Sequence, residues 1–242
     1  ILLLRGKTVK IKYLSAIAVL AVAAAGCSST PEFQTGPDAE MTHDGLTRVD
    51  RTVMDAVWAR KDIDLSGVTK IMFHSLGVQY RNDSGPYSGR AGTGSMRTRS
   101  STSEFQLDAD TRALFQEEIG GAFLEEFQRS TVFEVVEEPG PDVLGIHVGL
   151  LDVVSRVPPD SVGRSRVFLD SVGEATLVLE VRDSVSNTVL ARAVDRRAAQ
   201  SQGTMIESSP PRNRAEVRRL GRRWGQILRD GLEAMIADGM ST

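Results

Sequence analysis

Cys27 is the only cysteine among the 242 residues, and its position points to covalent chemistry. An apolar run from Tyr13 to Ala25 stands before it, followed by Gly26. Four basic residues precede that run: Arg5, Lys7, Lys10 and Lys12. A basic start, a short apolar run and small residues before a cut are typical of a secretory signal peptide. We expect cleavage between Gly26 and Cys27, since the run is shorter than the roughly 20 residues of a membrane-spanning helix.

The small residues before Cys27 resemble a bacterial lipobox, with Ala24 where leucine is more usual. In that motif the cysteine thiol is joined to diacylglycerol, the preceding peptide is removed, and the new amino group is acylated. The resemblance implies a covalent lipid on Cys27, and we expect no cofactor besides it. Several acyl chains, at about 0.8 kcal/mol per buried methylene, would anchor the chain to a membrane. The alternative is an ordinary signal peptide followed by a chance cysteine.

The chain divides into three predicted segments. Residues 1–26 are expected to be the signal peptide. We expect translation to begin at Val9, which would make residues 1–8 upstream readthrough. Residues 27–43 are expected to be the lipidated N-terminus and a flexible tether, because they are small, polar and proline-containing. Residues 44–242 are expected to be a single globular domain. Ser28 after the cysteine favours the periplasmic face of the outer membrane over the inner membrane, by resemblance to the enterobacterial sorting rule.

The charge balance and the rarity of metal ligands exclude several classes of protein. The chain has 29 basic and 32 acidic residues. Loss of residues 1–26 removes four basic and no acidic residues, which leaves a formal net charge of −7. This acidic balance gives no indication of nucleic-acid binding. One cysteine and three histidines exclude an intramolecular disulfide and a cysteine-rich zinc site.

Catalytic motifs are absent from the sequence. It contains no Walker loop and no Gly-x-Ser-x-Gly nucleophile elbow. His43, His74 and His147 are too far apart in sequence for a helix-borne metal site. We therefore expect a protein that is not an enzyme. A serine–histidine–aspartate site assembled from distant segments stays open as an alternative.

A long loop is predicted for residues 82–103, which are rich in glycine and serine. Asp83 is its only acidic residue, so the segment is locally basic. Arginine and tyrosine are frequent anchors at protein interfaces, and guanidinium groups suit carboxylates such as those of a cell-wall peptide. The candidate partner-binding residues are Arg81, Tyr87, Arg90, Arg97 and Arg99. The alternative is an insertion whose arginines only keep it solvated.

Two helices are predicted from the apolar periodicity. The first begins after an N-cap at Asp108 and carries large apolar residues at steps of four: Phe115, Ile119, Phe123 and Phe127. The second runs from about Asn213 to Ala237, and Gly231 is expected where it approaches the sheet closely. Its side away from the apolar stripe is basic, with Arg218, Arg219, Arg222, Arg223 and Arg229. That side either contacts anionic lipid or a partner, or is a solvated surface.

The remaining pattern predicts about five strands. They are expected at 68–80, 131–136, 143–154, 175–181 and 188–196. Gly145 and Gly149 share one face of the third strand, where we expect them to make room for a helix. The order of elements predicts an α+β fold: a two-layer sandwich with a mostly antiparallel sheet and two main helices on one face.

Several short motifs are spread over most of the chain after Cys27: Asp44-Gly45-Leu46, Asp64-Leu65-Ser66-Gly67, Pro139-Gly140-Pro141-Asp142-Val143-Leu144, Gly173-Glu174-Ala175 with Glu180, Arg182-Asp183-Ser184, then Ala191, Val194, Asp195 and Trp224. Together they resemble bacterial lipoproteins of the domain-of-unknown-function 3313 family. The resemblance implies a lipoprotein with a compact α+β domain. It implies no activity, since the function of that family is unknown.

These observations predict a non-enzymatic envelope lipoprotein that binds a protein or cell-wall partner, or has a structural role. The alternative is a periplasmic hydrolase or small-ligand-binding protein that uses a cleft near the 82–103 loop. An enzyme should show a pocket where several polar side chains converge, whereas an adaptor should show an exposed patch.

Overall fold

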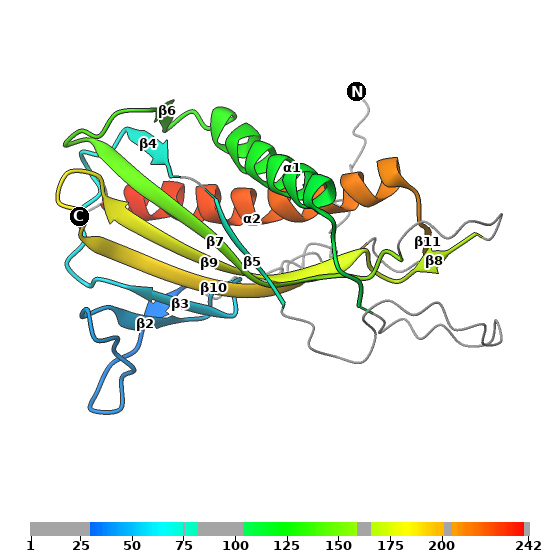
Figure 1. Ribbon diagram of the computed structural model, residues 1–242. Helices are drawn as coiled ribbons and strands as arrows, with labels where there is room; N and C mark the ends of the chain where they lie inside the picture. Colours follow the sequence, from blue (N-terminus) through cyan, green and yellow to red (C-terminus); the bar gives the residue numbers. More distant parts are fainter. Residues whose placement is uncertain (1–29, 75, 82–103, 159–165, 201–204, 240–242) are drawn as a thin grey trace, which may run out of the picture. The chain divides into compact units, whose positions relative to one another are not determined.

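The computed structural model describes residues 30–74, 76–81, 104–158, 166–200 and 205–239. The chain divides into two units, residues 1–30 and 31–242, and the description below concerns the second. In that unit a mixed sheet carries two helices on one face (Figure 1). The helices are α1 (Ala109–Gln128) and α2 (Pro210–Gly239). Neither described helix has the length and apolar character needed to cross a membrane.

The main sheet has nine strands among the described residues, in the order β1-β2-β3-β10-β9-β7-β4-β6, with β5 also paired to β7. Their bounds are β1 Glu32–Phe33, β2 Thr47–Asp50, β3 Ala56–Ala59, β4 Lys70–Phe73, β5 Gly77–Tyr80, β6 Glu134–Val136, β7 Val143–Ser155, β9 Gly173–Asp183 and β10 Val189–Ala199. A second, two-stranded sheet pairs β8 (Phe168–Leu169) with β11 (Ile206–Glu207).

The α+β fold with two helices is confirmed, but the predicted number of strands is too low. The segment 68–80 forms two strands, β4 and β5, which follow one another along the same edge of β7. Strands β1 to β3 have four residues or fewer, too short to show a period in the sequence. The sheet is also mixed, because β4 and β5 pair with β7, and β4 with β6, in parallel. Parallel neighbours need a crossover, and α1 provides it between β4 and β6.

The predicted tether also differs from the structure. Within 27–43, β1 pairs with β2 through Glu32↔Asp50 and Phe33↔Val49. Met41 forms a further bridge to Thr47. The second unit therefore begins at Pro31 rather than at residue 44.

The core lies between the helices and the sheet. Alternate residues of the central strands point toward the helices, as the period of two requires. In β7 and β9 these are Ile146, Val148, Leu150, Leu177, Leu179 and Val181, all buried. The aromatic stripe of α1 packs on them, with Phe127 fully buried and its ring 5.1 Å from that of Phe73. Three of its four large side chains, Ile119, Phe123 and Phe127, are buried in the core, and Phe115 is half-buried.

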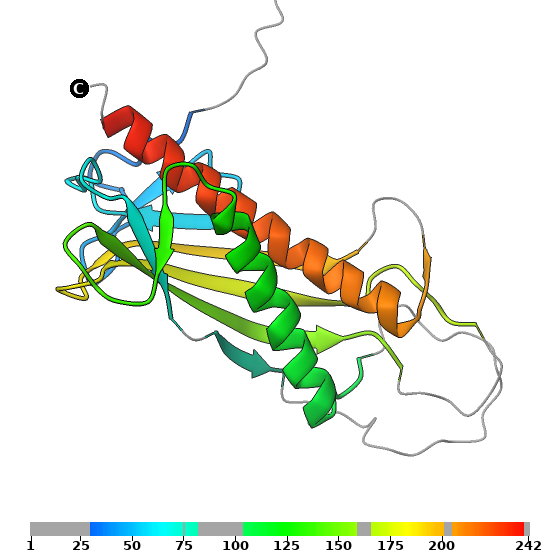
Figure 2. The same ribbon diagram turned by 90° about the horizontal axis from the view of Figure 1, so that it is seen from above.

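The two helices run parallel and side by side, so both begin at the same end of the sheet (Figure 2). Gly221 and Gly225 make their closest approach possible. A Cβ at Gly221 would lie 2.9 Å from the Cβ of Ala122 in α1. The close contact of α2 is thus with α1. The expected close approach of α2 to the sheet at Gly231 is wrong, because nothing lies within 4 Å of a Cβ placed there.

A buried carboxylate joins α2 to the sheet. The indole N–H of Trp224 donates to Asp195 Oδ2 at 2.7 Å, and Asp195 is only 1% exposed. Arg197 forms an ion pair with the same carboxylate, and the backbone N–H of Asp55 donates to it at 3.3 Å. A buried charge is tolerated only when it is paired and hydrogen-bonded in this way.

We predict that Trp224→Phe lowers the free energy of unfolding by about 3 kcal/mol, because it removes a donor to a buried charge and leaves a void. Trp58→Phe is the matched control. Its indole nitrogen is buried with no hydrogen-bond partner in the described part of the chain, so the loss should stay below about 1 kcal/mol. Urea unfolding followed by circular dichroism measures both. Equal losses would show that the Trp224–Asp195 bond contributes nothing specific.

Candidate functional site

A cleft of about 460 Å³ opens where both helices begin. It lies between the first turns of α1 and α2 and the ends of β7, β9 and β10. Most of its wall is apolar, contributed by side chains that include Leu107, Leu114, Phe115, Val154, Val157 and Val217. The cleft can therefore take up apolar groups from outside the chain.

Local sequence fixes the positions of the helix starts. The Asp108 side chain accepts a hydrogen bond from the Thr111 N–H at 2.7 Å and caps α1. Pro210 and Pro211 open α2, where their missing N–H groups are unneeded. Under the cleft, a Cβ at Gly173 would lie 2.2 Å from the Val154 carbonyl oxygen. Only glycine fits at that point of the floor.

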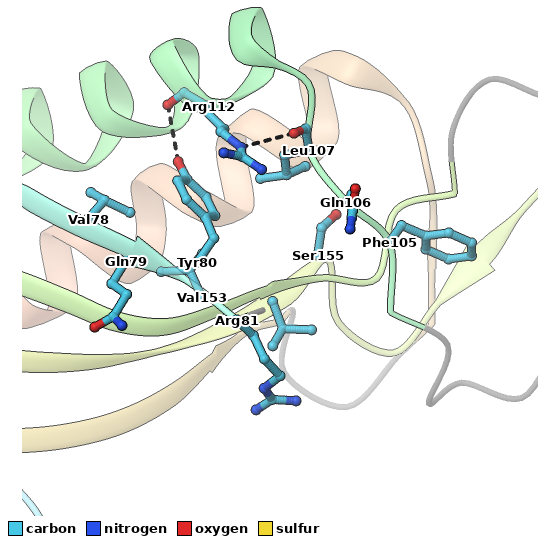
Figure 3. Close-up of a pocket in the computed structure, with 11 residues that line it drawn as sticks. Val78, Gln79, Tyr80, Arg81, Phe105, Gln106, Leu107, Arg112, Val153 and Ser155 are labelled. Atoms are coloured by element: carbon cyan, nitrogen blue, oxygen red, sulfur yellow. Dashed lines mark hydrogen bonds between the residues drawn. The ribbon is translucent and has the colours of Figure 1, made fainter. Parts of the chain in front are cut away.

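A smaller hollow of about 330 Å³ adjoins the cleft (Figure 3). The Arg112 guanidinium lies 4.5 Å from the ring centroid of Tyr80 and donates to the Leu107 carbonyl at 2.9 Å. Burial raises the pKa of Tyr80. Gln106, Leu107 and Ser155 line both the hollow and the cleft. Arg81 and Phe105 also line the hollow, so it lies where the chain enters and leaves the segment 82–103.

The acidic groups of the cleft are already compensated. Glu118 pairs with Arg218 at 3.1 Å, and Glu174 pairs with Arg196 at 2.8 Å. Asp108 accepts from the first turn of α1. Arg214 also lines the cleft, and no carboxylate of the described residues forms an ion pair with it. Among the charged side chains that line the cleft, Arg214 is thus the one without an ion-pair or hydrogen-bond partner in the described part of the chain.

Arg81 is the one predicted partner-binding residue that the structure describes. Its guanidinium donates to both oxygens of Asp152, at 2.5 and 2.6 Å, and to Glu104 at 2.5 Å. Asp152 sits at a bulge of β7 with a φ of 53°, a conformation that aspartate tolerates. Arg81 thus ties Glu104, which follows the segment 82–103, to β7. The positive charge of Arg81 is thus paired with carboxylates of the same chain, which argues against the expected role in partner binding.

The other predicted site residues lie outside the described residues. These are Gly26, Cys27, Tyr87, Arg90, Arg97 and Arg99. Their expected roles in lipid attachment, cleavage and partner binding stay predictions.

The histidines do not form a metal site in the described chain. His74 and His147 stack with their ring centroids 3.7 Å apart, and His43 is exposed elsewhere. Burial, followed by the neighbouring His74, lowers the pKa of His147. A Cβ added at Gly145 would lie 3.2 Å from His74 Nε2. Gly145 therefore makes room for His74, and the expectation that it makes room for a helix is wrong. In the part of the chain that is described, no three histidine, cysteine or acidic residues are grouped to hold a metal.

Three of the five arginines on the basic side of α2 form ion pairs within the described part of the molecule. Arg218 pairs with Glu118 and Glu125 of α1, and Arg229 pairs with Glu126 at 3.2 Å, so these two hold the helices together. Arg219 pairs with Glu216 of its own helix. This finding weakens the expectation that this side contacts lipid or a partner.

The Asp152 network predicts a specific acid sensitivity. Hydrogen bonds from Arg81 and then Arg196 lower the pKa of Asp152 to about 2 from its ordinary 3.8. Its stabilising effect is therefore fully present above pH 4 and is lost as the pH falls through about 2. Asparagine also tolerates the positive φ at position 152, so Asp152→Asn leaves the backbone unstrained. It should lower the free energy of unfolding by about 1 kcal/mol at pH 7, after allowance for solvent screening.

The difference in unfolding free energy between wild type and Asp152→Asn should shrink between pH 4 and pH 2. Urea titrations at each pH measure it. Asp38→Asn, at an exposed aspartate with no ion pair among the described residues, should show no such trend. A pH-independent difference for Asp152→Asn would contradict the assigned ion pair.

Comparisons with solved structures give distant matches. The PelC dodecamer from Paraburkholderia phytofirmans is 7% identical, with a TM-score of 0.32, over 71% of this chain and 96% of that one. A DUF330-family protein from Xanthomonas campestris is 13% identical, with a TM-score of 0.40, over 72% and 88%. A homologue of neuraminyllactose-binding hemagglutinin from Helicobacter pylori is 9% identical, with a TM-score of 0.36, over 70% and 86%.

No curated protein matches the chain. A family model does match, and it covers residues 40–226, which include α1, most of α2 and all strands of the main sheet but β1. The model is described as a protein of unknown function, DUF3313. The chain therefore belongs to the DUF3313 family.

Proposed function

We propose that this protein is a non-enzymatic envelope lipoprotein whose domain binds an apolar ligand in the cleft between the helix starts and the sheet. The observation that carries the proposal is the apolar wall of that cleft. Its volume of about 460 Å³ falls within the roughly 300–1,000 Å³ of ligand sites, which are mostly apolar with a few polar groups. This supports the ligand-binding alternative for the region near residues 82–103.

The ionisable groups favour binding over catalysis. A general acid needs a carboxyl group whose pKa is raised toward neutrality. Every described carboxyl group with a shifted pKa has it lowered, as in Asp44, Asp152 and Glu180. No histidine lines the cleft, and the Ser155 hydroxyl accepts from the Val157 N–H at 3.2 Å. The cleft therefore holds no activated nucleophile among the described residues.

The proposed anchor is lipid on Cys27, at the periplasmic face of the outer membrane. The domain begins at Pro31, four positions after this cysteine. An extended chain spans at most about 3.6 Å per residue, so the anchor would keep the start of the domain within about 14 Å of the lipidated residue. The ligand would then be drawn from, or delivered to, the membrane surface.

Cys27→Ala should leave an unprocessed precursor and abolish incorporation of labelled fatty acid, because the thiol is the attachment point. Metabolic labelling and envelope fractionation measure both effects. Ser28→Ala, next to the cut, is the matched control and should be processed and labelled normally. Lipid labelling of the Cys27→Ala protein would refute the anchor.

Ligand binding in the cleft is tested by a photo-crosslinking amino acid at Leu114. This residue lines the cleft and is 43% exposed, so the replacement should not disturb the core. Leu124 is the matched position, on the same helix, 39% exposed and away from the cleft. In intact envelopes we expect a small-molecule adduct at 114 and not at 124, detected by mass spectrometry of the purified protein. No adduct at 114, or equal adducts at both positions, would contradict the proposal.

A further inference from the structure

We infer that the ligand of the cleft is a long acyl chain that carries an anionic head group. The inference rests on the proposed function and specifies its ligand. The acyl chain lies against the apolar wall, and the head group is held at Arg214, on the first turns of α2.

The part of the ligand inside the cleft has no polar groups, because the wall offers few free partners for them. The polar side chains of the cleft that are already engaged are Asp108, Glu118, Ser155, Glu174 and Asn213. A buried polar group without a partner is costly. The wall itself is mainly aliphatic, with Phe115 as its one aromatic side chain. Hydrocarbon is the chemistry that fits.

Two short segments that follow residues of the cleft wall contain little hydrocarbon in their sequence. Pro158 and Ala199 line the cleft just before the segments 159–165 and 201–204. These read Pro-Asp-Ser-Val-Gly-Arg-Ser and Ser-Gln-Gly-Thr, with Val162 as the one branched apolar residue. Burial of apolar surface stabilises a complex in proportion to its area, and polar segments gain little from it. The apolar wall therefore suits a separate molecule.

The charge of the head group follows from the one charged side chain of the cleft without a partner among the described residues. The three carboxylates have partners within the chain: Glu118 shares Arg218 with Glu125, Glu174 pairs with Arg196, and Asp108 accepts from the start of α1. Arg214 is exposed and has no ion pair with a described carboxylate. A guanidinium group binds a carboxylate or phosphate with two parallel hydrogen bonds. Either group can therefore form an ion pair with Arg214, and a neutral head group cannot.

The test uses the full chain in its native envelopes and a palmitate probe that carries a diazirine and an alkyne. Light attaches the probe to the wild type, and the labelled peptides should come from the cleft. Leu114→Gln should reduce labelling at least about threefold, because the amide disfavours the hydrocarbon. Leu124→Gln, the matched control, should label like the wild type. Circular dichroism of the purified variants checks that each one is folded.

Competition identifies the head group. Unlabelled palmitate or lysophosphatidylglycerol should suppress labelling, and the stronger competitor distinguishes a carboxylate from a phosphate ligand. Hexadecanol, with the same chain and no charge, should compete about fivefold less well, and Arg214→Gln should remove that difference. Arg223→Gln is the control, since Arg223 is exposed on the same helix outside the cleft.

Equal labelling of Leu114→Gln and Leu124→Gln would overturn the inference, as would hexadecanol competing as well as palmitate. In either case, an adduct of other chemistry at position 114 in the envelope crosslinking would leave the proposed function in place. The absence of such an adduct as well would overturn both.

Discussion

The buried hydrogen bond between Trp224 and Asp195 is the constraint on which the arrangement of the helices depends. A carboxylate that is 1% exposed needs a donor at a fixed place, and the indole of α2 provides it at 2.7 Å. This fixes α2 over β10. Gly221 and Gly225 then allow α1 to approach α2 closely. One hydrogen bond thus positions α2 on the sheet, and two glycines of α2 allow α1 to pack closely against it.

The cleft is a consequence of this arrangement. The helices are in closest contact at Gly221 and Gly225, more than two turns after α2 begins. Ion pairs from Arg218 and Arg229 to α1 hold this part of the pair together. Near the helix starts no such contact between described residues closes the space above β7 and β9, and apolar side chains line it. Arg214 lines the cleft, and no described residue pairs with its guanidinium group.

The elements that are long enough to show a regular hydrophobic period were predictable from the sequence. Those that depend on distant partners were not. The α1 stripe and its Asp108 cap are where the pattern predicts them, and β9 alternates as expected. Strands β2 and β3 were missed, since four residues show no period. Arg81 was expected to bind a partner, but Asp152, 71 residues later, takes its charge. The cleft could not be predicted from the sequence, because its wall comes from five separated stretches of the chain.

The proposed anchor and the cleft explain one another physically. An open apolar cleft on a freely diffusing protein is a liability, because apolar surface in water promotes association. On a membrane the same surface faces a supply of amphiphiles. The proposed lipid on Cys27 would keep the start of the domain within about 14 Å of the anchored residue, and a domain tethered in this way meets amphiphiles at a high effective concentration. Even a weak affinity would then suffice for occupancy, which is consistent with a site that relies on aliphatic contacts and a single exposed arginine.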